Sequence, residues 1–201
     1  MIKWSDLWRS DFVSYRRYLL DRCLEAYTDR MRGVVLDVGG KRERKRGWFC
    51  PPATLARQWL YVNIAPETRP DIIADATAVP MPDGCADCVI CTEVLEHLPN
   101  ATACVEEAYR LLKPTGVLLA SVPFLYPVHA DPFDFQRFTE DGLLYLCRQF
   151  STVRVLSMGG FLGTVGMLIE NRSAWPRRLV ARAWNCSPCA HCFSALSILA
   201  R

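Results

Sequence analysis

The chain has 201 residues, 51% of them hydrophobic and 22% charged, which is enough to build one hydrophobic core. Its net charge of +3 is too small to indicate nucleic-acid binding, so no nucleic-acid partner is expected. The first residues lack the apolar stretch of a signal peptide, and no 18-residue apolar run could span a bilayer. We therefore expect a soluble cytoplasmic protein whose ten cysteines are reduced thiols.

Apolar residues at helical spacing predict an amphipathic helix in an N-terminal cover comprising residues 1–32. They are Leu7, Phe12, Tyr15, Leu19, Cys23 and Tyr27. The branched run from Val34 to Val38, closed by two glycines, predicts a buried first strand. After a basic loop, a short helix is expected from Leu55 to Trp59 and a second strand from Leu60 to Ile64.

Strand-like and helix-like segments continue to alternate along the chain. Strands are predicted at 71–74, 87–92, 117–122 and 153–158, and helices at 101–112 and 143–150, the second capped by Thr139. This order predicts an α/β fold: a doubly wound, Rossmann-like, mostly parallel sheet of about six or seven strands with helices on both faces. We assign the domain to residues 33–170.

Polar residues stop three of the predicted strands. Asp37 precedes Gly39 and Gly40, Asp75 follows the third strand, and Glu93 follows the fourth. The carboxyl ends of parallel strands face one crevice, so these residues are expected to converge on a binding site there.

Four segments in this order resemble motifs of class I S-adenosylmethionine-dependent methyltransferases: residues 35–40, 74–80, 87–97 and 110–116. The resemblance covers about residues 33 to 158 and is closest to type 11-like enzymes. Residues 123–139 resemble a subgroup associated with bacterial sugar, polysaccharide and natural-product pathways. The resemblance to these methyltransferases implies S-adenosylmethionine as cofactor and a small-molecule or glycan acceptor.

The resemblance also implies residue roles. Gly39 and Gly40 would let the backbone approach the methionine part of the cofactor, and Asp37 would fix its amino end. Asn63 stands where an acid usually holds the ribose, and Asp75 would accept from the adenine amino group. The full expected cofactor set is Asp37, Val38, Gly39, Gly40, Asn63, Ile64, Asp75, Ala76, Thr92 and Glu93.

Lys41 and Arg42 replace further glycines of the first motif. This basic loop either meets an anionic group of the substrate or is a solvated loop, and the second interpretation is favoured because charge runs usually face water.

The long aromatic and polar segment after the fifth strand supplies the candidate catalytic residues. His129 is the candidate general base, with Asp131 or Asp134 to orient it. The expected substrate-binding residues are His97, Tyr126, Asp134 and Arg137. In the alternative interpretation, His129 and Arg137 only hold the loop through the two aspartates.

No metal site is expected. Cys88 and Cys91 of one cysteine set should point to opposite faces of a strand. The other set, Cys186, Cys189, Cys192 and His191, is too crowded in sequence for a typical zinc site.

The basic and apolar segment 171–201 has three open interpretations: a cover helix, which is favoured, a homodimer surface, or a peripheral membrane contact. Residues 159–170 fit either a last antiparallel strand or a helix. The leading functional hypothesis is O-methylation of a sugar or glycosylated natural product. The alternatives are C-methylation of a small aromatic or quinone-like lipid, and a non-catalytic partner subunit that keeps the fold.

Overall fold

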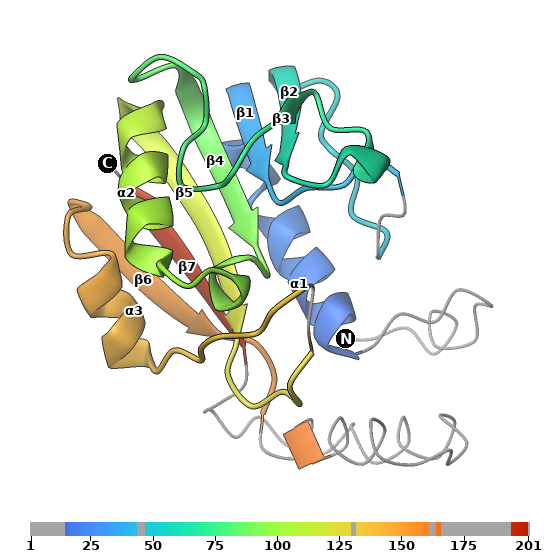
Figure 1. Ribbon diagram of the computed structural model, residues 1–201, viewed down its shortest axis with the longest axis vertical. Coiled ribbons are helices and arrows are strands. Elements are labelled where there is room, and N and C mark those ends of the chain that lie inside the picture. The colour runs from blue at the N-terminus through green and yellow to red at the C-terminus, as the bar shows by residue number, and fades with distance from the viewer. Residues whose placement is uncertain (1–14, 44–46, 130–131, 161–163, 166–193, 201) are drawn as a thin grey trace.

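One seven-stranded sheet organises the described part of the chain in the computed structural model, in the strand order β3-β2-β1-β4-β5-β7-β6 (Figure 1). The structure describes residues 15–43, 47–129, 132–160, 164–165 and 194–200. The strands are β1 Gly33–Val38, β2 Ala56–Asn63, β3 Ile72–Ile73, β4 Ala86–Thr92, β5 Leu112–Pro123, β6 Thr152–Ser157 and β7 Ser194–Ala200. The α-helices are α1 Tyr15–Ala26, α2 Ala101–Leu111 and α3 Glu140–Leu146, and the short 3₁₀ helices are η2 Thr28–Arg30, η3 Pro66–Thr68 and η4 Leu95–His97.

The first five strands pair in parallel, whereas β7 pairs antiparallel with both β5 and β6. This pairing, with helices packed on both faces, confirms the predicted doubly wound, mostly parallel α/β sheet.

Both faces of the central strands are apolar, as expected for a buried parallel sheet. Alternate side chains of β1, β4 and β5 join α2 and α3 in one core cluster, and the others join α1 in a second cluster. Cys91 belongs to the first cluster and Cys88 to the second, so these thiols do point to opposite faces. Figure 1 shows α2 and α3 in front of the sheet and α1 behind it.

The helix predicted near the N-terminus is present as α1. Its most deeply buried residues are Leu20 and Leu24, which are 2% and 3% exposed, while the predicted Leu19, Cys23 and Tyr27 are only partly buried. Leu7 and Phe12 lie outside the described residues.

The helix predicted from Leu55 to Trp59 is wrong, because β2 already begins at Ala56. Gln58 and Trp59 pair with Val34 and Val35 of β1, so the strand extends over the segment assigned to a helix. Parallel pairing with a central strand outweighs local helical preference here. Thr139 does cap α3, since its hydroxyl oxygen accepts from the Gly142 N–H at 3.1 Å.

The cover helix favoured for 171–201 is wrong for residues 194–200, which form the inner strand β7, whereas the dimer surface and the membrane contact remain predictions. A strand hydrogen-bonded on both sides satisfies its backbone within the sheet. Thr164 and Val165 are helical, and the remaining residues between 161 and 193 lie outside the described part. None of the helices in the described ranges combines the length and apolar composition needed to cross a bilayer.

The inner position of β7 predicts a large effect of proline at Ile198, which pairs with Leu119 on one side and Arg154 on the other. Ile198→Pro removes a ladder donor and should lower the free energy of unfolding by about 3 kcal/mol or more. Thermal unfolding measures the loss, with Ile198→Val as the control that keeps the donor. Equal unfolding temperatures for the two variants would contradict an inner β7.

Candidate functional site

The sheet register brings the predicted polar residues to one edge. Val38 of β1 pairs with Val62 of β2 and with Cys91 of β4, and Thr92 of β4 pairs with Ser121 of β5. The residues that follow these strands therefore lie side by side, at the lower side of the sheet in Figure 1. The structure thus gathers the expected cofactor residues, whose contacts with the cofactor remain predictions.

The two glycines after β1 form a tight turn in which a side chain would collide with the protein. The resemblance had implied a different reason, the close approach of the cofactor. Gly39 has a φ of +77°, and a Cβ there would lie 2.2 Å from Cγ2 of Val94. A Cβ on Gly40 would lie 2.4 Å from Cγ of Asp37. A side chain at either position would therefore collide with the protein itself before it reached any cofactor.

Asn63 at the end of β2 holds this glycine turn in place. Its Nδ2 donates to the carbonyl oxygens of Gly39 and Gly40, both at 3.0 Å, and its Oδ1 accepts from the Ala65 N–H at 2.9 Å. An aspartate could not make the two donated bonds. Fixing the turn is a role that sequence reasoning missed, and the ribose contact remains a prediction.

Several features of this edge suit S-adenosylmethionine. Ile64 is 66% exposed and offers an apolar surface for a base, while Asp37 lies near the end of β1 and Asp75 follows β3. Asp75 accepts from the N–H and hydroxyl of Thr77 at 2.8 and 2.7 Å, which fixes its orientation, and Ala76 follows it.

In the basic loop, Arg42 pairs with Asp71, with Nη2 2.5 Å from Oδ1. It also lies over the ring of Tyr61. Arg42 thus has contacts within the protein that neither interpretation of the loop anticipated.

Glu93 connects three parts of the structure. It has a φ of +58°, its N–H donates to the Ser121 carbonyl oxygen at 2.9 Å, and its carboxylate accepts from the Ser121 hydroxyl at 2.9 Å and pairs with Arg16 of α1. Arg16 also lies over the ring of Tyr126, 4.4 Å from its centroid, and burial lowers the pKa of its guanidinium. A strained backbone held by so many contacts is typical of functional sites. Sequence reasoning missed Arg16, which carries no motif.

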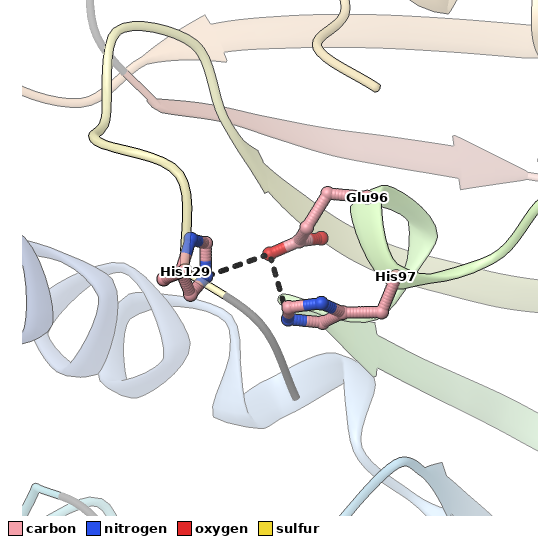
Figure 2. A group of neighbouring side chains, drawn as sticks. All are labelled: Glu96, His97 and His129. Carbon is pink, nitrogen blue, oxygen red and sulfur yellow. Dashed lines mark ion pairs between the residues drawn. The ribbon is translucent and has the colours of Figure 1, made fainter. Parts of the chain in front are cut away.

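Beyond Glu93, a carboxylate and two imidazoles form a cluster, which we call the Glu96–His97–His129 cluster (Figure 2). Glu96 Oε1 lies 3.7 Å from Nε2 of His97 and 3.9 Å from Nε2 of His129. The Glu96 side chain is 0% exposed, and among the described residues neither of its oxygens accepts a hydrogen bond. Burial raises the pKa of its carboxyl group.

Sequence reasoning assigned roles to Glu93 and His97 but passed over Glu96 between them. This segment forms η4, a 3₁₀ turn that directs Glu96 into the protein. A charged residue between Leu95 and His97, in a segment bounded by Leu95 and Leu98, was the available signal.

Hydrogen bonds join the loop after β5 to η4. Gln136 Nε2 donates to the carbonyl oxygens of Leu95 and Leu98 at 3.2 and 2.8 Å, and the Phe135 N–H donates to that of Glu96 at 2.8 Å. This loop, yellow in Figure 1, therefore lies at the carboxyl ends of the strands, as predicted.

Asp134 and Arg137 organise the same loop internally. Both terminal nitrogens of Arg137, Nη1 and Nη2, donate to the Asp134 carboxylate, and Nη2 also donates to the Tyr126 carbonyl oxygen at 3.2 Å. The Arg137 bond holds the pKa of Asp134 well below its usual range. These contacts match the structural interpretation of the two residues, while their predicted substrate contacts remain untested. Asp131 lies outside the described residues.

His129 is fixed by Asp134, whose Oδ2 accepts from the His129 N–H at 2.9 Å and lies 3.4 Å from Nδ1 of the ring. Burial lowers the pKa of His129, which favours the neutral ring, and its Nε2 lies on the side of Glu96.

Comparison with known proteins agrees with this description. A family model described as a methyltransferase domain matches residues 53–120. An S-adenosylmethionine-dependent methyltransferase from Archaeoglobus fulgidus shares 16% identity over 92% of this chain and 94% of that chain, with a TM-score of 0.58. Another from Mesorhizobium loti shares 16% over 90% and 96%, with a TM-score of 0.58.

The 1,6-didemethyltoxoflavin-N1-methyltransferase of Burkholderia thailandensis shares 18% identity over 98% of this chain and 81% of that chain, with a TM-score of 0.59. That structure contains 1,6-didemethyltoxoflavin and S-adenosylhomocysteine. No curated protein matches the chain. A methyltransferase-domain model thus matches part of the chain, and the chain shares the fold of solved S-adenosylmethionine-dependent methyltransferases.

The bonds of Asn63 predict that Asn63→Asp weakens the glycine turn. A carboxylate would face the Gly39 and Gly40 carbonyl oxygens, so unfolding should become easier by about 2 kcal/mol and S-adenosylhomocysteine should bind more weakly. Thermal unfolding and calorimetric titration measure the two effects.

Asn100→Asp is the matched control, because Asn100 caps α2 through its side-chain oxygen, which accepts from the Ala103 N–H at 3.1 Å, and aspartate caps equally well. Unchanged stability with tighter binding in Asn63→Asp would instead favour a direct ribose contact.

Proposed function

We propose that this protein transfers the methyl group of S-adenosylmethionine to a hydroxyl group of a sugar or glycosylated natural product. The observation that carries the proposal is the Glu96–His97–His129 cluster, which lies next to Glu93 at the carboxyl end of β4. A hydroxyl is a weak nucleophile until its proton is removed, and a neutral imidazole in this position can assist that removal.

The other requirement is alignment. S-Adenosylmethionine supplies an activated methyl group, and the protein has to hold the acceptor oxygen in line with the methyl carbon and the leaving sulfur. The glycine turn fixed by Asn63 and the loop fastened to η4 are rigid elements on two sides of the proposed reaction centre. Both support a catalytic protein over a partner subunit that merely keeps the fold.

A second acceptor class, a small aromatic or quinone-like lipid, is favoured by the side chains around the loop. Val128, Phe133 and Phe135 are 85%, 61% and 52% exposed, and they could cover an apolar ring. The Burkholderia thailandensis structure also holds a small-molecule ligand, 1,6-didemethyltoxoflavin, although that enzyme is named for methylation at a nitrogen.

Two measurements separate these functions. Calorimetric titration of the full chain with S-adenosylmethionine should show binding, and its absence would leave only the partner-subunit reading. Incorporation of labelled methyl into a panel of sugars, glycosides and phenols then identifies the acceptor, with carbon and oxygen products distinguished by mass spectrometry. A carbon-methylated product would refute O-methylation.

His129→Asn should lower turnover of the identified acceptor by about a hundredfold or more while S-adenosylmethionine affinity stays nearly constant. Asparagine keeps a donor toward Asp134 and removes only the outer nitrogen of the ring. Thermal unfolding is the control for loop integrity. Turnover close to that of the unchanged protein would show that alignment alone drives the reaction.

A further inference from the structure

We propose that Glu96, His97 and His129 bind a divalent transition-metal ion. The site itself follows from the geometry and burial of these three side chains. Its catalytic use rests on the proposed function, because the ion would lie where the acceptor hydroxyl has to be activated.

The distances suit a common ligand sphere. One oxygen of Glu96 and one nitrogen from each histidine lie within 4.8 Å of one another, and the two distances from Glu96 are 3.7 and 3.9 Å. Ligands at about 2.0–2.2 Å from one ion are roughly 3–3.5 Å apart, so a small rotation of the side chains closes the site.

Burial supplies a second, independent argument. Glu96 is fully buried, and among the described residues its two oxygens receive no hydrogen bond, although His97, Arg16 and Arg137 are electrostatically favourable neighbours. A buried carboxylate without direct bonds is costly, since charge in the interior requires pairing or metal coordination. A cation between Glu96 and the imidazoles would supply the missing bonds.

The two histidines are also oriented as metal ligands usually are. His97 Nδ1 lies 2.5 Å from the carbonyl oxygen of Phe133, so this nitrogen donates its proton and Nε2 keeps its lone pair. His129 has Nδ1 toward the Asp134 carboxylate, at 3.4 Å. Metal-bound histidines typically turn their other nitrogen to a carbonyl or carboxylate, which fixes the tautomer. Both Nε2 atoms here lie toward Glu96 (Figure 2).

The donor set indicates the kind of ion. Two imidazoles and one carboxylate suit Zn²⁺, Fe²⁺, Co²⁺ or Mn²⁺, whereas Mg²⁺ and Ca²⁺ prefer oxygen ligands. Three protein ligands leave coordination positions open for an acceptor oxygen.

In the reaction, coordination would acidify the acceptor hydroxyl, and its proton would pass to water. The oxygen then forms a bond to the methyl carbon while the carbon–sulfur bond breaks, and that electron pair stays on sulfur in S-adenosylhomocysteine. His129 would serve as a ligand in this scheme rather than take the proton itself.

Cobalt absorption tests the site without an acceptor. The full chain is stripped with a chelator and titrated with Co²⁺, and we expect one bound ion per chain with the visible bands of nitrogen and oxygen ligation. Glu96→Gln, His97→Asn and His129→Asn should each weaken binding by a hundredfold or more, since even outer-shell partners contribute about 10–100-fold. Both asparagine variants keep the donor on the loop side of the ring, so folding is preserved.

Two control variants locate the ion. Glu106→Gln changes an exposed acid of α2 and should leave Co²⁺ binding unchanged. His191→Asn changes the remaining histidine of the sequence, beside three cysteines, and should also leave it unchanged. The proposal would be overturned if only His191→Asn lost Co²⁺ binding. It would also be overturned if all three ligand variants bound Co²⁺ as tightly as the unchanged protein.

Turnover separates this inference from the proposed function. Methyl transfer that falls on chelation and returns with Co²⁺, Zn²⁺ or Mn²⁺ supports the metal site. Turnover that ignores chelation but is lost in His129→Asn overturns the metal and leaves O-methylation by direct proton removal. A normal cobalt signature with no methylated hydroxyl acceptor supports the metal site and refutes the proposed function.

Discussion

The site depends on one constraint, which is that the carboxyl ends of the parallel strands lie at the same edge of the sheet. Because β2, β1, β4 and β5 are paired in parallel and in register, residues from four distant parts of the sequence meet at one edge. The edge alone would be a mobile set of loops. Two sets of side-chain hydrogen bonds stabilise it. The Asn63 amide bonds the glycine turn, and Gln136 bonds η4 from the loop after β5.

Much of the fold could be predicted because buried parallel strands are short apolar runs that end in glycine or polar residues. The regions around β1, β4 and β5 illustrate this. The strand β2 was partly mistaken for a helix, because Ala56 to Trp59 acquires its extended form from pairing with β1. The strand β7 was missed because its partners, β5 and β6, are decided by pairing across a long stretch of sequence.

The candidate site was predictable where a motif places a residue at a strand end, as for Gly39 and Asp75. It was not predictable where the role depends on contact between distant segments. Glu96 is a candidate site residue only because it is buried beside His129, which comes from another loop. Arg16 is a candidate only because it contacts Glu93 at the edge of the sheet. Asn63 shows the same principle, since its bonds to the turn became visible only with the register of β1 and β2.

The position of β7 has a consequence for how the protein is made. Within the described sheet, β6 pairs only with β7, which is separated from it by 36 residues of sequence. During synthesis, β6 and the outer side of β5 therefore leave the ribosome well before the strand that joins them. Such delayed, long-range pairing slows folding and leaves unpaired strand edges open to association with other chains. A nascent chain of this protein should accordingly depend on chaperones until residues 194–200 have emerged.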